Sequence, residues 1–146
     1  MNKTMKNAAN CVVYALLSVL LLSCLTGCGK KIDSALWENA LYTEDTELGE
    51  GSKTVKVVVE ADTHKITFTI HTDEEVLGDA LLANKLIEGD ESEFGLYVKK
   101  VNGITADYDV DQSYWAFYQN GEYMNTGVDG AAFEDGAQYE LVYTKG

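Results

Sequence analysis

The residues best suited to binding chemistry form a short aromatic segment divided by an Asn-Gly pair. The run from Tyr114 to Met124 contains five aromatic residues, and Asn120-Gly121 lies within it. Both turn residues tolerate the positive φ of a type I′ turn, so the pair predicts a β-hairpin. Because side chains alternate along a strand, aromatic residues fall on both faces of this hairpin. Aromatic faces can cover a flat apolar ligand, but the same residues also favour strands and fill cores.

A second group of chemically active side chains is acidic. Asp107, Asp109 and Asp111 alternate along the chain, and clustered carboxylates are ligands that Ca²⁺ prefers. An EF-hand loop counted from Asp107 would need Gly at its sixth position and an acid at its twelfth, where this chain has Gln112 and Tyr118. The segment is therefore not an EF-hand. A solvated acidic loop is the main expectation, and a looser Ca²⁺ site is the weaker alternative.

The remaining polar residues give little support for catalysis. Ser52, Ser92 and Ser113 fall in expected loops, without the Gly-x-Ser-x-Gly pattern of a nucleophile elbow. His64 and His71 do not have the spacing of metal ligands. We therefore expect a protein that is not an enzyme and needs no cofactor.

The N-terminal segment predicts export and lipid attachment. Lys3 and Lys6 precede an apolar run from Val12 to Leu25, which is typical of a signal peptide. This run of 14 residues is short for a membrane span, which needs about 20. The sequence Leu-Thr-Gly-Cys at 25–28 resembles the lipobox of bacterial lipoproteins. The resemblance implies removal of residues 1–27, a lipid on Cys28, and a domain exposed at the outer face of the cell membrane.

Removing that segment leaves an acidic single domain. The mature chain would have 119 of the 146 residues, and loss of two lysines changes the net charge from −13 to −15. Without any arginine and with this charge, the chain is unsuited to nucleic-acid phosphates. Cys11 and Cys24 leave with the signal, so the mature domain would have no free thiol and no disulfide.

The mature chain divides into a spacer and a domain. Residues 28–52 are acidic and without hydrophobic period, which indicates a spacer between lipid and domain. Trp37 and Tyr42 are unusual in a spacer, and either dock on the domain or lie near lipid headgroups. The domain is expected to cover residues 53–146.

The start of this domain predicts a hairpin followed by a helix. Two stretches alternate apolar with polar residues and predict half-buried strands, at about 55–60 and 65–71, joined by a turn at 62–64. Thr72 with Glu75 is a capping-box pattern that predicts a helix over 73–86. Gly78 weakens this helix and indicates close packing on the sheet. An acidic loop is expected around 89–93.

Several strands follow. They are expected at about 96–101, near Ile104, in the aromatic hairpin, and at 139–143 after an Asp-Gly turn. A hairpin, one helix and further strands predict an α+β fold of the β-grasp type, with the helix packed across a mixed sheet.

Three sequence pieces carry a resemblance to a known family. They are Leu77 to Leu82 in the helix, Gly95 to Gly103 in the following strand and turn, and the segment from Tyr114-Trp115 through Gly127-Val128 to Asp135-Gly136. Together they resemble bacterial domains similar to the C-terminal domain of transcobalamin and intrinsic factor. The resemblance covers about Lys53 to Lys145.

The resemblance implies a ligand-binding module, with cobalamin or another corrinoid as the candidate ligand and a membrane transporter as a candidate partner. The animal proteins hold cobalamin between this domain and a helical barrel, for which 119 residues leave no room, so a second protein could complete the site. The implied ligand-binding residues are Tyr114, Trp115, Phe117, Tyr118, Asn120, Tyr123 and Met124. The alternative is a surface module that binds a protein or a glycan through the aromatic hairpin.

Overall fold

The computed structural model describes residues 34–146. The predicted signal peptide and the lipidation site at Cys28 lie outside the described residues. Within the described part, no helix is long and apolar enough to cross a membrane.

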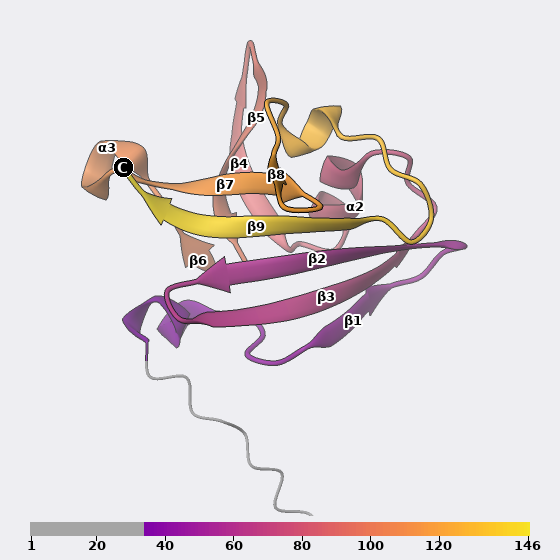
Figure 1. Cartoon of the computed structure of the whole chain (residues 1–146), viewed down its shortest axis with the longest axis horizontal. Helices are drawn as coiled ribbons and strands as arrows, with labels where there is room; N and C mark the ends of the chain where they lie inside the picture. Colours follow the sequence, from indigo (N-terminus) through magenta and orange to yellow (C-terminus); the bar gives the residue numbers. More distant parts are fainter. Residues whose placement is uncertain (1–33) are drawn as a thin grey trace, which may run out of the picture. The chain divides into compact units, whose positions relative to one another are not determined.

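One mixed six-stranded sheet carries most of the fold, in the order β1-β3-β2-β9-β7-β8 (Figure 1). β2 and β3 form an antiparallel hairpin, β9 runs parallel to β2 and antiparallel to β7, and β1 runs parallel to β3. The strands are β1 (Thr46–Gly49), β2 (Lys53–Ala61), β3 (His64–Thr72), β7 (Ser113–Gln119), β8 (Glu122–Tyr123) and β9 (Gln138–Lys145). The α+β prediction is confirmed, with the expected helix and mixed sheet.

The β2–β3 hairpin follows the predicted alternation. The inward residues Val55, Val57 and Val59 are completely buried, and they lie opposite Ile70, Phe68 and Ile66. Asp62 turns the chain with φ at 58°, a value that Asp tolerates better than most residues. Alternation therefore builds one apolar sheet face, as expected for a half-buried hairpin.

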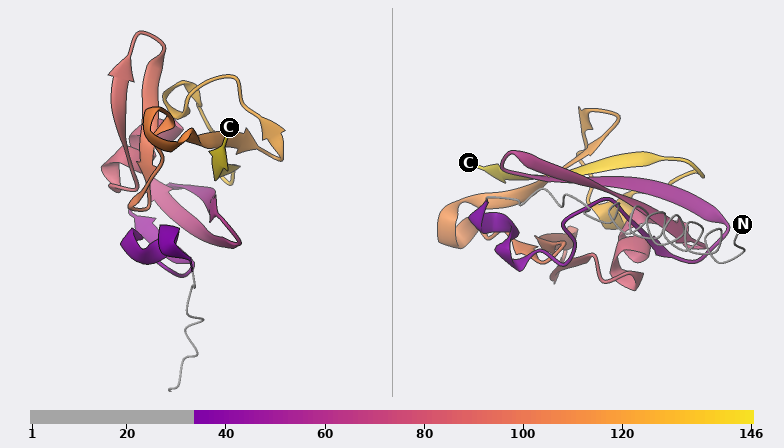
Figure 2. Two further views of the ribbon diagram at one scale, coloured as in Figure 1. Left: turned by 90° about the vertical axis from the view of Figure 1, so that its left-hand side faces the viewer. Right: turned by 90° about the horizontal axis from the view of Figure 1, so that it is seen from below.

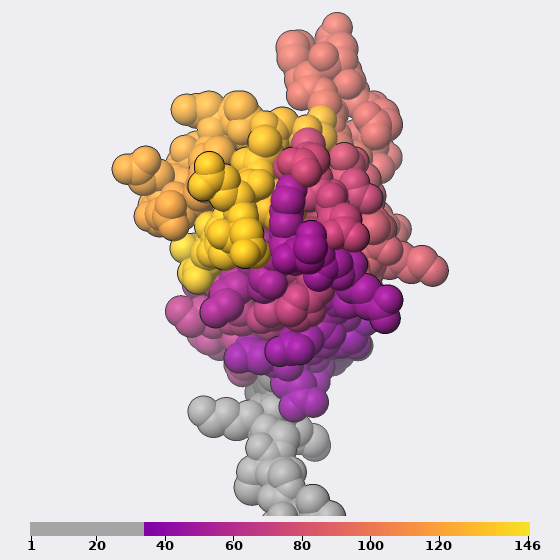
Figure 3. All heavy atoms as spheres, turned by 90° about the vertical axis from the view of Figure 1, so that its right-hand side faces the viewer, coloured from indigo at the N-terminus to yellow at the C-terminus, as the bar shows by residue number. Residues whose placement is uncertain are grey.

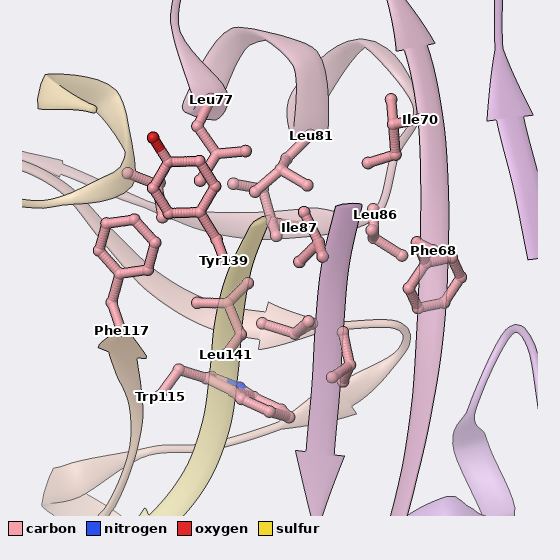
Figure 4. Packing of buried hydrophobic residues seen from close by; sticks show 14 of the residues in the cluster. Phe68, Ile70, Leu77, Leu81, Leu86, Ile87, Trp115, Phe117, Tyr139 and Leu141 are labelled. Carbon is pink, nitrogen blue, oxygen red and sulfur yellow. The ribbon is translucent and has the colours of Figure 1, made fainter. Parts of the chain in front are cut away.

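The longest helix of the described residues, α2 (Leu77–Ala83), covers that apolar face. Leu77, Ala80 and Leu81 are completely buried, and Leu77 and Leu81 point toward the sheet residues in Figure 4. The predicted start at 73 is wrong. Thr72 belongs to β3, and its hydroxyl accepts a hydrogen bond from the Glu74 N–H rather than capping a helix.

Gly78 packs differently from the expectation. A Cβ on Gly78 would lie 3.0 Å from the backbone N and Cα of Asp129, in the short 3₁₀ segment η2 (Val128–Gly130). The close approach is therefore to η2, and the predicted close packing against the sheet was wrong.

A second sheet stands beside the first and has the order β4-β5-β6. Its strands are β4 (Ile87–Ser92), β5 (Gly95–Val101) and β6 (Ile104–Thr105). The acidic loop predicted around 89–93 instead includes the end of β4, which pairs with β5 in a hairpin that projects from the body (Figures 1 and 2). Polar residues dominate β4 because all its residues after Ile87 are exposed.

The segment assigned to a spacer is folded from Ser34 onward. Trp37, in the 3₁₀ helix η1 (Ala35–Asn39), is 3% exposed, and its indole N–H donates to the Ala61 carbonyl at 2.9 Å. The Tyr42 ring contacts the Phe68 ring edge-on, with the ring centroids 5.6 Å apart. β1 extends the sheet beside β3. Trp37 and Tyr42 therefore dock on the domain, and the folded unit begins well before the predicted boundary at Lys53.

Candidate ligand-binding cleft

A cavity of about 340 Å³ lies between the projecting β4–β5 hairpin and the aromatic hairpin. Its walls come from Leu96, Tyr97 and Val98 of β5, from β7, and from residues 123–128. Figure 3 shows the two projections, one around residues 88–98 and the other around 120–130, standing apart on the surface. The volume is at the lower end of the range for small-molecule pockets.

The cleft brings together five of the seven predicted ligand-binding residues. Its lining includes Tyr114, Trp115, Phe117, Tyr123 and Met124. The remaining two lie elsewhere. Tyr118 is outside this lining, and Asn120 lines a separate depression beside Gln138 and Tyr139.

The predicted turn explains how the hairpin carries these residues. Asn120 and Gly121 have φ values of 51° and 80°, and Gln119 pairs with Glu122 across the two-residue turn. The backbone N–H of Met124 then donates to the Phe117 carbonyl at 2.9 Å. This bond holds Met124 beside the aromatic face of β7.

Trp115 is the most unusual group of the cleft lining. The residue is 8% exposed, and its ring meets Tyr143 edge-on with centroids 5.7 Å apart. In Figure 4, Trp115 and Phe117 extend from β7 beside Leu141 of β9. Within the described residues, the Trp115 indole N–H is a buried side-chain polar atom without a hydrogen-bond partner. Such a donor carries a desolvation cost until an acceptor reaches it.

The backbone of Trp115 adds further hydrogen-bonding groups. Phe117 directs its carbonyl away from β9, since this carbonyl accepts from Met124. Residues two apart on a strand point their backbone groups to the same edge, so Trp115 also directs its N–H and C=O away from β9. β8 pairs only with Tyr118 and Gln119, so among the described residues this part of the β7 edge has no strand partner.

Asp129 ties the opposite wall of the cleft together. Its carboxylate accepts from the Leu96 N–H at 3.0 Å, which links η2 to β5. A Cβ on either Gly95 or Gly127 would collide with this carboxylate, so glycine at both positions allows the link to form. Sequence reasoning did not single out Asp129, Leu96 or Val98 as site residues, because only tertiary packing brings them to the cleft.

The rim of the cleft is aromatic and open to solvent. Tyr97 is 42% exposed and Tyr123 is 57% exposed, while Phe94 at the tip of the β4–β5 hairpin is 90% exposed. Exposed aromatic side chains at a cavity mouth are groups that ligands and partner proteins use for contact.

The tyrosines of β7 and its neighbours make two further ring contacts, and two of these tyrosines, Tyr114 and Tyr123, also line the cleft. Tyr118 meets Tyr123 edge-on at 5.5 Å, and Tyr114 lies 6.5 Å from Tyr108 of the short helix α3 (Tyr108–Asp111). Tyr118 and Tyr114 share the phase of β7 that points away from Trp115 and Phe117, as alternation predicts.

Two of the three aspartates of the weak Ca²⁺ candidate, Asp107 and Asp111, accept hydrogen bonds from protein donors. Asp107 accepts from the Asp109 N–H at 3.0 Å and caps α3. Asp111 accepts from the Ser113 N–H and hydroxyl, and it pairs with the Lys145 ammonium at 3.0 Å. Hydrogen bonds from Ser113, followed by that of Lys145, lower the pKa of Asp111 to about 2. No group of three or more His, Cys, Asp or Glu side chains in residues 34–146 is arranged to hold a metal ion.

Comparison with known proteins places this architecture in a family. A family model described as a domain of unknown function, DUF4430, matches residues 74–145. A crystal structure described as "a putative metal binding protein from Ruminococcus gnavus ATCC 29149" has 33% sequence identity and a TM-score of 0.62, covering 65% of this chain and 99% of that chain. The chain belongs to the DUF4430 family.

The DUF4430 chain also resembles haptocorrin, whose structure was solved in complex with Cbi. That match has a TM-score of 0.52 at 20% identity and covers 67% of this chain. The DUF4430 chain spans only 26% of the haptocorrin chain, and the likeness shows a transcobalamin-like fold. No curated protein matches the sequence.

Proposed function

We propose that this protein is a lipid-anchored module that binds a small ligand in the cleft between β5 and β7. The observation that carries the proposal is the aromatic lining of the cavity, which includes Trp115; the indole N–H of this residue is buried and has no hydrogen-bond partner among the described residues. Phe117 and Met124 would contact the apolar part of the ligand, and a carbonyl or other neutral acceptor would satisfy the indole N–H if binding turns this buried donor toward the cleft.

A corrinoid is the candidate ligand, and the cleft fits it in part. The macrocycle carries several amide side chains on an apolar ring, which match an unpartnered donor beside aromatic residues. A cavity of about 340 Å³ is too small for the whole molecule, so only one edge of the ring or one amide arm would enter. The rest would lie against Tyr97 and Tyr123 at the rim, or against a second protein.

Titration with cobinamide and cobalamin, read by calorimetry on the chain from Ser34 onward, tests the proposal. Trp115→Phe removes the indole donor but keeps an aromatic ring, and Tyr118→Phe is the matched control on the opposite sheet face. We expect saturable heat that is reduced in Trp115→Phe and unchanged in Tyr118→Phe. Absence of heat with either corrinoid would reject corrinoid capture by this module alone.

The second candidate is a surface module that binds a glycan or a protein. Tyr114 and Tyr118 on the outer sheet face, with Tyr108 and Tyr123 beside them, favour it. Such a site would lose binding in Tyr118→Ala and keep it in Trp115→Phe, the reverse of the pattern expected for the cleft.

The cellular setting is part of the proposal. Lipidation at Cys28 would hold the module at the outer face of the membrane, where it could pass a captured ligand to a transporter. The net charge of −13 and the lack of arginine argue against nucleic acid as a partner. In the Cys28→Ser variant, mass spectrometry of the purified protein should no longer show the added mass of a lipid, and the chain should be released from membranes. Membrane retention of that variant would reject lipid anchoring.

A further inference from the structure

The chain contains two Asn-Gly pairs that have the same φ values, but the asparagine of one pair is buried and that of the other is exposed. Asn102 and Asn120 both have φ at 51°, and Gly103 and Gly121 both have φ at 80°. Asn-Gly is the dipeptide most open to deamidation in general, because glycine does not hinder attack by its own backbone nitrogen. The shared dipeptide and φ values make both pairs candidates for deamidation, so a large difference between them would come mainly from their environment.

The Asn102 amide is locked. Asn102 is completely buried, its Oδ1 accepts from the Tyr42 N–H at 2.9 Å, and its Nδ2 donates to the Tyr42 carbonyl at 2.8 Å. The Asn102 backbone is also fixed, with its N–H donating to the Leu86 carbonyl at 2.8 Å. Attack on this side chain would first require both side-chain hydrogen bonds to break and water to enter the core.

The Asn120 amide is free to react. Asn120 and Gly121 are exposed, and no atom lies within 4 Å of the position of a Cβ on Gly121. Within the described residues, the Asn120 side chain makes no hydrogen bond, in contrast to both side-chain bonds of Asn102. Only two residue pairs, from Tyr118 to Tyr123 and from Gln119 to Glu122, join β7 to β8 next to this turn. Such a short ladder can open locally at low cost.

We propose that Asn120 is a site of spontaneous deamidation in the folded protein and that Asn102 is protected from it. The Gly121 backbone nitrogen attacks Cγ of Asn120, a C–N bond forms, and the side-chain amide leaves as ammonia. Water then opens the cyclic imide at one of its two carbonyls. The product is either aspartate, with the original backbone, or isoaspartate, with the backbone running through the former side chain.

The isoaspartate product would change the wall of the cleft. It adds one methylene to the backbone of a two-residue turn, whose length fixes the register of β7 against β8. That register holds Met124 through its N–H to the Phe117 carbonyl and places Tyr123 at the rim. We expect the Met124 N–H to lose its hydrogen bond in the isoaspartate form. The shape of the cleft would therefore change gradually as more molecules deamidate over time.

Peptide mapping by mass spectrometry tests the proposal on the full chain, incubated folded at mildly alkaline pH and, in parallel, in denaturant. Replacement of the amide by a hydroxyl marks deamidation, and an isoaspartate-specific methylation assay separates the two products. In the folded chain we expect reaction at Asn120 and about 10³-fold or greater suppression at Asn102. The suppression reflects the equilibrium constant of unfolding, since Asn102 must be exposed to react. In denaturant both sites should react at similar rates.

Amide exchange at Met124 supplies the structural readout. It should be faster in the isoaspartate form than in the unmodified chain. It should keep the unmodified rate in Asn120→Asp, which carries the charge without the longer backbone, and in Asn120→Ser, which cannot deamidate. Retention of the Asn120 amide in the folded chain, while denatured chain reacts, would overturn the proposal. Equal reaction at Asn102 and Asn120 in the folded chain would overturn it too, as would unchanged Met124 exchange in the isoaspartate form.

Discussion

Asn102 and Tyr42 exchange two hydrogen bonds although 60 residues separate them. The Asn102 side chain pairs with both backbone groups of Tyr42, much as a neighbouring strand would. Its own carbonyl accepts from the Leu41 N–H at 2.9 Å. One buried amide in the turn between β5 and β6 therefore holds the N-terminal segment, from η1 to β1, against the rest of the domain.

Asn102→Gly should destabilise the protein although glycine adopts positive φ without strain. The change leaves both part-buried Tyr42 backbone groups without their partner, and each unsatisfied group costs up to about 1–3 kcal/mol. Urea unfolding measures the loss. Asn120→Gly at the exposed turn is the matched control and should change stability by less than about 0.5 kcal/mol. Equal effects of the two changes would contradict the role assigned to Asn102.

A fragment that begins at Lys53 should be much less stable than one that begins at Ser34. It lacks Trp37, which fills the core, and β1, which covers the edge of β3. Loss of a buried tryptophan side chain alone costs about 3–5 kcal/mol. Thermal unfolding of the two fragments provides the comparison, and equal melting temperatures would show that residues 34–52 only rest on the surface.

The two tryptophans should respond oppositely to the same chemical change. Trp37→Phe leaves the Ala61 carbonyl without its donor and should cost about 1–3 kcal/mol. Trp115→Phe removes a donor that has no partner among the described residues, so relief of its desolvation offsets lost packing and the net change should stay within about 1 kcal/mol. Chemical denaturation of both variants tests this. A large loss for Trp115→Phe would mean that its indole N–H has a partner in the unliganded protein.

Acid should remove the stabilising effect of Asp111. Hydrogen bonds from Ser113 and Lys145 lower its pKa from 3.8 to about 2, so the folded state favours the ionised form. This contribution is present above the unfolded-state pKa of 3.8 and is lost as the pH falls through about 2, below which both states are protonated. The stability difference between wild type and Asp111→Asn should therefore shrink over this window. A difference that stays constant across it would refute the assignment.

Gly78→Ala should destabilise the protein although alanine is the better helix former. Alanine gains about 1 kcal/mol of helix propensity. Its Cβ would press on the backbone of Asp129, which is itself hydrogen-bonded to β5 through its side chain. Overpacking of this kind costs about 1–3 kcal/mol, so a net loss is expected in denaturant titrations. A net gain in stability would show that the η2 backbone shifts at little cost to accommodate the added methyl group.

Alternation of apolar and polar residues and turn dipeptides correctly predicted those parts of the fold that depend on residues close together in the sequence. Alternation in β2 and β3 predicted which valines are buried, and Asn120-Gly121 predicted the turn that positions the aromatic hairpin. The same alternation separated Trp115 and Phe117 from Tyr118. Each of these features depends on neighbours in the chain, which a single sequence shows directly.

The rest depends on contacts between distant segments. Thr46 to Gly49 has an acidic, irregular sequence, and it becomes a strand because the edge of β3 offers backbone partners. β4 is acidic for a similar reason, since it pairs with β5 while exposing its side chains. The opposite wall of the cleft, around Leu96 and Asp129, also arises only when β5 and η2 meet.

The position of β9 has a consequence for the order of folding. Gln138 to Lys145 is the last strand in sequence, yet it lies at the centre of the main sheet, between β2 and β7. Without it, the β2–β3 hairpin and the aromatic hairpin would share no backbone hydrogen bonds within that sheet. Pairing over such a long sequence separation is slow, because loop closure precedes the gain from contacts. The main sheet is therefore completed only once residues 138–145 can pair between β2 and β7.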